Sequence, residues 1–404
     1  MKLTWPAAFP GVHYLDAQEQ QAALDVLQSC SPFRYYGPRK PRHVEAFEAA
    51  ARQFYGSTHA LAVNSGTGAL MTVMTALAIG PGDEVIVPAF LWVSTVGAVV
   101  FANAIPVLCE IDDTFGIDPE DLKKKITPRT KLIIAVHMAG SPCGMEPIIS
   151  IARQRGIPVL EDCAQCNGGS LFGKSVGTFG RAGIFSFQIN KNCTAGEGGL
   201  VVTDDPDLYH RLNAAHDVGV PWSEGTAQAN SPHLAWGQGR RMSELIGAVA
   251  CVQMGKLPRI IRAMRASKKS IKHMLAGIPG LSFRRIIDDA GDTGCALIFL
   301  LPDARKATSA VKSMREAGLG GTRLADYGMH IYCNTPQLVA KVPLSPAGNP
   351  WGLPQNASSV YNYAKGACPR SDELFAKSII LAIPSCLNQE QEEQAAMVIR
   401  EAIM

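Results

Sequence analysis

Residues 130–162 read TKLIIAVHMAGSPCGMEPIISIARQRGIPVLED, two apolar runs of strand length with a helical stretch between them. Strands buried on both faces of a parallel sheet are nearly continuous apolar runs, and a helix usually connects one to the next. The same alternation recurs from about residue 59 to residue 205, in the runs HALAVN, DEVIVP, PVLCEID, TKLIIAVH, IPVLED, AGIFSF and GLVVTDD. We therefore predict an α/β fold with a mostly parallel sheet covered by helices on both faces.

The composition is that of a folded, soluble protein. Of the 404 residues, 47% are hydrophobic and 18% are charged, and the net charge is only +3. We expect two domains, an N-terminal arm and large domain over residues 1–255 and a smaller C-terminal α/β domain over residues 256–404. The charge argues against a nucleic-acid partner, and no apolar run is long enough to cross a membrane. Scattered cysteines and the lack of a secretory pattern indicate a cytoplasmic protein.

The segment NSGTGAL, residues 64–70, connects the first predicted strand to an apolar helix. A glycine-rich turn at a helix start presents free backbone N–H groups and the positive end of the helix dipole, which together hold a phosphate. A tight turn without a ligand explains the same pattern. Ligands of open parallel sheets bind at the carboxyl ends of the strands, so the turn lies where a site is expected.

Three polar residues follow later strands of the predicted sheet. Asp162 ends the run IPVLED; a buried carboxylate needs a cationic partner, although an aspartate that caps a helix gives the same pattern. Gln165 lies one turn further on. Lys191, in FSFQINKNCTAGEGG (residues 185–199), precedes a glycine-rich turn. A partly desolvated lysine there can react as a nucleophile, whereas most lysines only face solvent.

Two further residues lie near strand ends. Ser186, on the strand before Lys191, can add a hydroxyl to a phosphate site. Trp92, in VPAFLWVST, offers a flat face on which an aromatic ring can stack, but a core tryptophan needs no ligand. Together the chain offers a phosphate cradle, a stacking ring, a carboxylate, an amide and an amine. Pyridoxal 5′-phosphate (PLP) requires all five, for its phosphate, ring, ring nitrogen, ring oxygen and aldehyde.

The motifs resemble the DegT/DnrJ/EryC1/StrS family of aminotransferases from about Phe33 to the C-terminus. They are SGTGAL, PGDEVIVPAFLWVST, EDCAQ, GKSVGTFGRAGIFSFQINKNCTAGEGGLVVT and RRMSELIGA. The resemblance implies the PLP-dependent transferase fold of the aspartate aminotransferase type (fold type I). It also implies a homodimer with its active site at the subunit interface. The expected substrates are an amino acid donor, glutamate or glutamine, and a keto-sugar, keto-sugar acid or cyclitol ketone as acceptor.

The resemblance also implies a role for each candidate residue, and it implies no metal. Lys191 would form the Schiff base with the cofactor and later move the proton. Asp162 would pair with the pyridinium nitrogen, and Gln165 would bond the phenolic oxygen. Trp92 would stack on the ring. The phosphate would be held by Gly66, Thr67 and Ser186.

Two positions depart from the family pattern. Gln188 stands where the family often has histidine. Gly239, in GQGRRMSEL, stands where the family usually has an asparagine that reaches the phosphate of the neighbouring subunit. Gln238 or Arg240 can replace that asparagine, or Arg240 can bind a substrate carboxylate or phosphate. Arg240 and Tyr35, in SPFRYYG, are therefore candidate substrate-binding residues.

Alternative functions on the same fold remain open. Family members that dehydrate sugars replace the Schiff-base lysine with histidine, and regulators on this fold usually lose the lysine or the aspartate. Lys191 and Asp162 argue against both. The segments HMAGSPCGM, IPGLSFRRIIDDAGD and CPRSDELFAKSI look most like the transaminases that make 8-amino-8-deoxy-Kdo. That likeness favours a free keto-sugar acid or cyclitol ketone over a sugar nucleotide.

Two other patterns yield structural predictions. Cys163 and Cys166 form a CxxC pair, which we interpret as buried thiols and not as a redox or zinc site. Residues 242–276 predict one or two helices, interrupted by Gly255 and Pro258. Arginines and lysines recur at nearly three-residue steps from 259 to 272, which is typical of a solvated helix face.

Overall fold

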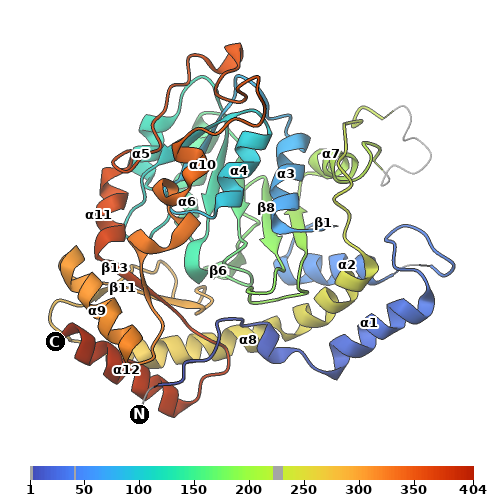
Figure 1. The fold of residues 1–404 in the computed structure, drawn as a ribbon. Helices are drawn as coiled ribbons and strands as arrows, with labels where there is room; N and C mark the ends of the chain where they lie inside the picture. The colour runs from blue at the N-terminus through green and yellow to red at the C-terminus, as the bar shows by residue number, and fades with distance from the viewer. Residues whose placement is uncertain (1–2, 41, 222–230) are drawn as a thin grey trace.

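A computed structural model describes residues 3–40, 42–221 and 231–404, and it confirms the α/β fold (Figure 1). Its central sheet has seven strands in the order β1-β9-β8-β5-β4-β2-β3. These are β1 (His59–Val63), β2 (Glu84–Pro88), β3 (Ile105–Cys109), β4 (Thr130–Val136), β5 (Val159–Asp162), β8 (Ala182–Ser186) and β9 (Gly199–Thr203). The neighbours from β8 to β3 are parallel, and β9 runs antiparallel to both β1 and β8. The mostly parallel sheet is thus confirmed, with one reversed strand.

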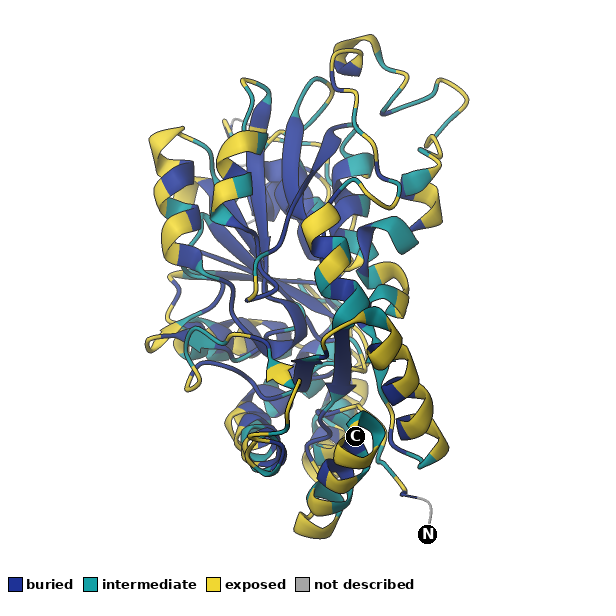
Figure 2. Ribbon diagram, turned by 90° about the vertical axis from the view of Figure 1, so that its left-hand side faces the viewer, coloured by how far each residue is buried: buried dark blue, intermediate teal, exposed yellow. Residues whose placement is uncertain are grey.

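Helices cover both faces of this sheet, as the alternating side chains of β1 illustrate. Leu61 and Val63 point into one core, which α3 (Gly66–Ala76), α4 (Val93–Phe101) and α7 (Pro206–His216) complete. Ala60 and Ala62 point into the other, with α2 (His43–Tyr55) and α8 (Glu244–Met274). At the far edge, α5 (Pro119–Lys125) and α6 (Met145–Gln154) pack on β3 and β4. The strands are therefore buried, and exposed residues lie on the outer sides of the helices (Figure 2).

A second, smaller sheet lies in the C-terminal part of the chain. Its antiparallel strands have the order β10-β11-β13-β12: β10 (Ser282–Phe283), β11 (Ala296–Leu300), β12 (Thr322–Arg323) and β13 (Ser378–Ala382). One face packs against α9 (Ala304–Glu316), α12 (Gln389–Ile403) and the last turns of α8. Shorter helices, α10 (Pro336–Val339) and α11 (Pro369–Lys377), lie between β12 and β13.

One continuous helix, α8, connects the regions around the two sheets. It is 31 residues long and passes through both Gly255 and Pro258, so the predicted interruption is wrong. Pro258 is exposed, and packing against α1 (Ala17–Ser29), α2 and α12 holds the helix on either side of it. The predicted domain boundary at residue 255 falls within α8 and stays a prediction. No helix among the described residues is long and apolar enough to cross a membrane.

The basic residues of α8 are not uniformly solvated, which corrects the prediction for this helix. Lys268 is buried, and its ammonium lies 2.9 Å from both carboxylate oxygens of Asp292. The segment around Asp292 packs directly on α8, because a Cβ on Gly294 would come within 2.4 Å of the backbone nitrogen of Arg265. Helical periodicity alone does not reveal such a long-range contact.

The N-terminal arm, residues 3–16, runs along the small sheet toward the large sheet. The backbone N–H of Leu3 donates to the carbonyl of Ala317, and the indole N–H of Trp5 donates to that of Ala382. Further on, the N–H of Gly11 donates to the carbonyl oxygen of Lys191 at 3.1 Å. The arm therefore joins the small sheet to the lysine that the sequence singles out.

Glu244 provides a test of how α2 and α8 are joined. Its buried carboxylate accepts hydrogen bonds from the backbone N–H groups of Arg42, His43 and Val44, at the start of α2. Glu244→Ala leaves these donors without an acceptor and is expected to lower the free energy of unfolding by about 3 kcal/mol. Urea unfolding followed by circular dichroism measures the change.

The control for this prediction is Glu316→Ala. Glu316 is exposed on α9 and lies 3.9 Å from Lys312, so its removal is expected to change the free energy of unfolding by about 0.5 kcal/mol or less. Equal unfolding midpoints for the two variants would contradict the capping role of Glu244.

Candidate active site

The residues that the sequence assigns to the cofactor meet in one cavity of about 330 Å³ at the carboxyl edge of the large sheet. It collects the segments that follow β1, β2, β4, β5 and β8, because the carboxyl ends of these strands share one edge. Its lining includes Gly66, Thr67, Trp92, Asp162, Gln165, Ser186 and Lys191, together with Ser65, Ser94, Gln188, Asn190, Glu197 and His330. All seven residues assigned to the cofactor from the sequence therefore lie together.

Asp162 is the last residue of β5 and is buried. The hydroxyl of Thr95 donates to its Oδ2 at 2.7 Å, and the backbone N–H of Ala164 donates to its Oδ1 at 3.1 Å. Burial raises the pKa of the Asp162 carboxyl, and these two neutral donors only partly offset the effect. The carboxylate is thus fixed in place and lacks a bonded cation among the described residues.

Lys191 lies in the turn that follows β8 and is half-buried. Its backbone is held from both sides, since its N–H donates to the carbonyl of Gln188 and its carbonyl accepts from Gly11. Burial lowers the pKa of the Lys191 ammonium, and the negative charge of Asp162 works in the opposite direction. A lowered pKa increases the fraction of neutral amine, which is the nucleophilic form.

The start of α3 lines one part of the cavity. Ser65 is the N-cap of the helix, and its hydroxyl accepts from the N–H of Gly68. Gly66 is required by close packing, because a Cβ there would lie 2.8 Å from the Cβ of Ser186. The hydroxyl of Thr67 donates to that of Ser94 at 2.8 Å. Hydroxyl groups and the first turn of a helix converge here, which is a suitable environment for a phosphate.

Trp92 and His330 line another part of the cavity. Their ring centroids are 4.6 Å apart, and His330 stacks on Tyr327 at 4.2 Å. Burial lowers the pKa of His330 to about 4, and the charge of Lys191 acts in the same direction. His330 is therefore neutral near pH 7. Its Nδ1 lies 3.2 Å from the carbonyl oxygen of Tyr327, so the proton resides on Nδ1 and Nε2 remains an acceptor.

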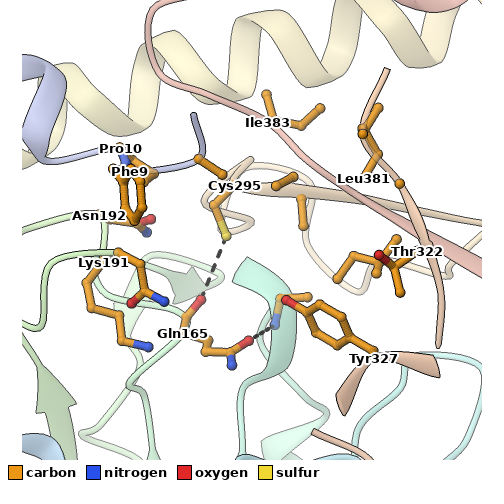
Figure 3. A pocket seen from close by; sticks show the side chains of 18 of the residues that line it. Phe9, Pro10, Gln165, Lys191, Asn192, Cys295, Thr322, Tyr327, Leu381 and Ile383 are labelled. Atoms are coloured by element: carbon orange, nitrogen blue, oxygen red, sulfur yellow. Dashed lines mark hydrogen bonds between the residues drawn. The ribbon is translucent and has the colours of Figure 1, made fainter. Parts of the chain in front are cut away.

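A second cavity, of about 430 Å³, shares Lys191, Gln165 and His330 with the first. Figure 3 shows Lys191 and Gln165 on one side of it and Thr322 and Leu381, from the small sheet, on the other. The N-terminal arm supplies part of its lining. The remaining lining residues include Trp5, Pro6, Phe9, Pro10, Asn190, Asn192, Cys295, Tyr327, Ile380 and Ile383.

The sequence does not identify several of these residues. Ser94 lies in the first turn of α4, whereas Cys295, Tyr327 and His330 come from a bend or from short turns, which have no periodic pattern to place them. Ser94 had a detectable signal, because it begins the helix that follows Trp92 and a hydroxyl at a helix start is a common anion contact. The others require the tertiary structure.

Tyr35 and Arg240 do not line either cavity of this chain. The Tyr35 hydroxyl lies 2.8 Å from Nε2 of His216. Arg240 is buried beside the glycine turn, where its carbonyl accepts from the N–H of Asn64. One guanidinium nitrogen of Arg240 donates to Gln238, and the other, Nη1, has no hydrogen-bond partner among the described residues.

Cys163 and Cys166 are buried as free thiols, as interpreted from the sequence. Burial raises the pKa of the Cys163 thiol to about 12, which disfavours the reactive thiolate. The sulfur of Cys163 lies near His137 and Glu161. The carboxylate of Glu161 already accepts from His137 Nε2 and from the N–H groups of three residues, namely Gly177, Phe179 and Gly180. We therefore assign this cluster to packing beneath the site.

A sequence model of the DegT/DnrJ/EryC1/StrS aminotransferase family matches residues 14–338. The chain belongs to this family. Its structure is similar to that of 3-amino-5-hydroxybenzoic acid (AHBA) synthase, with 26% identity, a TM-score of 0.79, and 100% of this chain and 98% of that chain covered. It is also similar to DesV of S. venezuelae, crystallised with a ketimine intermediate, with 27% identity, a TM-score of 0.79, and 99% and 98% covered.

Dehydratases share this family fold. The E. coli GDP-4-keto-6-deoxy-D-mannose-3-dehydratase with bound hydrated PLP is 21% identical, has a TM-score of 0.80, and covers 98% of both chains. At that identity the likeness concerns the fold alone. The reaction of a DegT/DnrJ/EryC1/StrS family member therefore has to be argued from its site residues.

The environment of Lys191 predicts its reactivity in the cofactor-free protein. Because burial lowers its pKa, Lys191 is expected to react with acetic anhydride at lower pH than exposed Lys312 does. Asp162→Asn removes the negative charge that favours the ammonium, so Lys191 of this variant is expected to be labelled at a still lower pH. Peptide mass spectrometry across a pH series measures both, and labelling of Lys191 in parallel with Lys312 would refute the prediction.

Proposed function

We propose that the chain is a PLP-dependent aminotransferase that transfers an amino group from glutamate or glutamine to a keto-sugar, a keto-sugar acid or a cyclitol ketone. The observation that carries the proposal is the placement of the Lys191 amine and the buried Asp162 carboxylate on one cavity, with a phosphate-type cradle at its end. Membership of the DegT/DnrJ/EryC1/StrS aminotransferase family supports it.

The residues fit the cofactor. Among the described residues only neutral donors bond the buried carboxylate of Asp162, and a protonated pyridine nitrogen would supply the missing cation. Trp92 provides a stacking surface, and Gln165 provides an amide for the ring oxygen. The phosphate-binding groups are proposed to be Gly66, Thr67 and Ser186, with Ser94 added from the structure. Bound PLP supplies an electron sink that stabilises negative charge on a substrate carbon.

The protein groups supply binding and proton movement. Asp162 keeps the ring nitrogen protonated, because its negative charge favours the positive form of its partner. Lys191 would hold the cofactor aldehyde through Nζ. Its neutral amine, once free, would accept a proton from the donor Cα and deliver it to the aldehyde-derived carbon of the cofactor. The lowered pKa of Lys191 favours this neutral form near pH 7.

The second cavity is the proposed place for donor and acceptor. It adjoins Nζ of Lys191 and combines an apolar wall with side chains that form neutral hydrogen bonds, including those of Asn190, Thr322 and Tyr327. Nε2 of neutral His330 accepts a hydrogen bond from a substrate hydroxyl. A ring that carries several hydroxyls and an apolar face suits this lining.

The site of each protomer is proposed to be completed by a partner in a homodimer. Gly239 replaces the asparagine that relatives in this family usually carry, and its φ of +61° places it in the left-handed region that glycine adopts freely. Next to it, Nη1 of Arg240 is buried and has no hydrogen-bond partner among the described residues, which suits an anion brought by a second subunit. We propose that Arg240 contacts a phosphate or carboxylate there.

Reduction and half-reaction experiments test the proposed function. The protein with added PLP is expected to be yellow, and borohydride is expected to leave a pyridoxyl group on the peptide that contains Lys191, since only an imine is reduced in this way. Lys191→Ala should lose the label, and Lys312→Ala should keep it. A protein that takes up no PLP would overturn the proposal.

The same holoprotein separates amino transfer from dehydration. Glutamate is expected to bleach the visible band with one 2-oxoglutarate formed per site, and a keto acceptor should restore the band as its own aminated product appears. A deoxy-ketone product with released ammonia would instead identify a dehydratase. Screening donor and acceptor pairs by the colour change names the substrates.

Arg240→Ala tests the anion contact. The variant is expected to weaken binding of PLP or of an anionic substrate by about ten-fold to a hundred-fold, because a hydrogen bond to a charged group contributes roughly 1.5–3 kcal/mol. Titration of cofactor, donor and acceptor measures each affinity. Arg262→Ala, an exposed position on α8, is the matched control. Three unchanged affinities would remove Arg240 from the site.

A further inference from the structure

Arg284, directly after β10, is a buried cation with no role in the site described above. Its guanidinium donates to three backbone carbonyl oxygens: from Nε to Thr114 at 2.7 Å, from Nη1 to Met138 at 2.7 Å and from Nη2 to Ser141 at 3.4 Å. A guanidinium removed from water is tolerated only when its donors are satisfied. Arg284 therefore fastens the small domain to the segment that follows β4.

The segment that Arg284 fastens is a turn with unusual backbone angles. Ala139 has a φ of +53° and Gly140 has a φ of +79°, both in the left-handed region, which is unfavourable for alanine. The carbonyls of Met138 and Ser141 flank these two residues, so the bonds from Arg284 hold the turn on both sides. The N–H of Thr293 adds a hydrogen bond to the carbonyl of Gly140 at 2.8 Å.

This turn contacts Gln165 through two N–H groups. The N–H of Ala139 donates to Oε1 of Gln165 at 3.2 Å, and that of Gly140 donates to the Gln165 backbone carbonyl at 2.9 Å. Because the amide oxygen of Gln165 accepts from the N–H of Ala139, the NH₂ group of Gln165 remains available to donate into the cavity. A rotated amide would place two donors face to face.

We propose that Arg284 is a positioning residue, which clamps the Met138–Ser141 turn so that Gln165 presents its NH₂ group, and not its oxygen, to the ring oxygen of the cofactor. The inference rests on the proposed function, since it uses the role of Gln165 given there. It assigns a site-building task to a residue of the small domain that does not line either cavity.

The clamp has a spectroscopic consequence. A donor aimed at the cofactor's ring oxygen stabilises its anionic form, so it lowers the pKa at which the visible band of the resting holoprotein changes with pH. Without the clamp, the Gln165 amide samples other orientations and that pKa rises. A merely structural role for Arg284 would lower stability without moving this pKa.

The main experiment compares the pH dependence of visible absorbance in full-length holoprotein variants. Arg284→Met is expected to raise the apparent pKa by about one unit, the size of one hydrogen bond to a charged group. Arg284→Lys should give an intermediate shift, because lysine lacks the planar fork that reaches several carbonyls. Arg285→Met is the control, since Arg285 is exposed and pairs with Asp113, and it should give no shift.

A double variant identifies the route. Gln165→Ala should raise the same pKa, and adding Arg284→Met to it should raise it no further. An additional shift of full size, or an unchanged pKa in folded Arg284→Met, would overturn the proposal. If Arg284→Met does not fold, the same readings on Arg284→Lys decide.

Hydrogen exchange of the cofactor-free protein provides a measurement that does not depend on PLP. Arg284→Met, or Arg284→Lys in its place, should speed exchange of the Ala139 and Gly140 amides by about ten-fold, with the Arg285→Met control unchanged. Unchanged protection would overturn the clamp. A protein that never takes up PLP would end the proposed function, while exchange would still decide whether Arg284 holds the turn.

Discussion

The candidate site depends on one buried carboxylate that has no bonded cation among the described residues. Asp162 is removed from water at the end of β5, and the described residues bond it only through neutral donors. Such a group is stable as an anion only if positive charge is brought near it. Lys191 lies across the same cavity, and the lowered pKa of its amine and the raised pKa of the acid follow from the same burial. The strand ends, the glycine turn and Trp92 line a cavity in which a cationic ring would supply the positive charge that Asp162 lacks.

The strands and most residues of the candidate site could be predicted from the sequence. The apolar runs predict the strands, and parallel strands bring their polar ends to one edge. Four residues lie about a hundred residues or more after the glycine turn and still reach the same cavity: Asp162, Gln165, Ser186 and Lys191. They do so because each lies at or after the end of a strand of the same sheet. Their individual roles toward the cofactor stay predictions. The apolar run of β9 does not reveal that this strand is antiparallel to its neighbours.

Features that depend on contacts between distant segments were not predictable. Gly255 and Pro258 argue against a continuous helix by intrinsic propensity, but packing along α8 overrides that preference. His330 and Tyr327 come from a region of short turns in which no periodicity distinguishes a functional ring from a surface one. Lys268 looks solvated in a helical pattern, but it is buried against Asp292, 24 residues later in the chain.

The N-terminal arm helps to shape a cavity without supplying a strand to the sheets. It lines the second cavity through Trp5, Pro6, Phe9 and Pro10, yet this stretch lies outside the helices and strands and contributes no strand to either sheet. Substitutions there can reshape the space beside Lys191 while the sheet and the phosphate cradle stay intact. The arm is therefore a segment through which the cavity beside Lys191 can be reshaped without a substitution in a strand of either sheet.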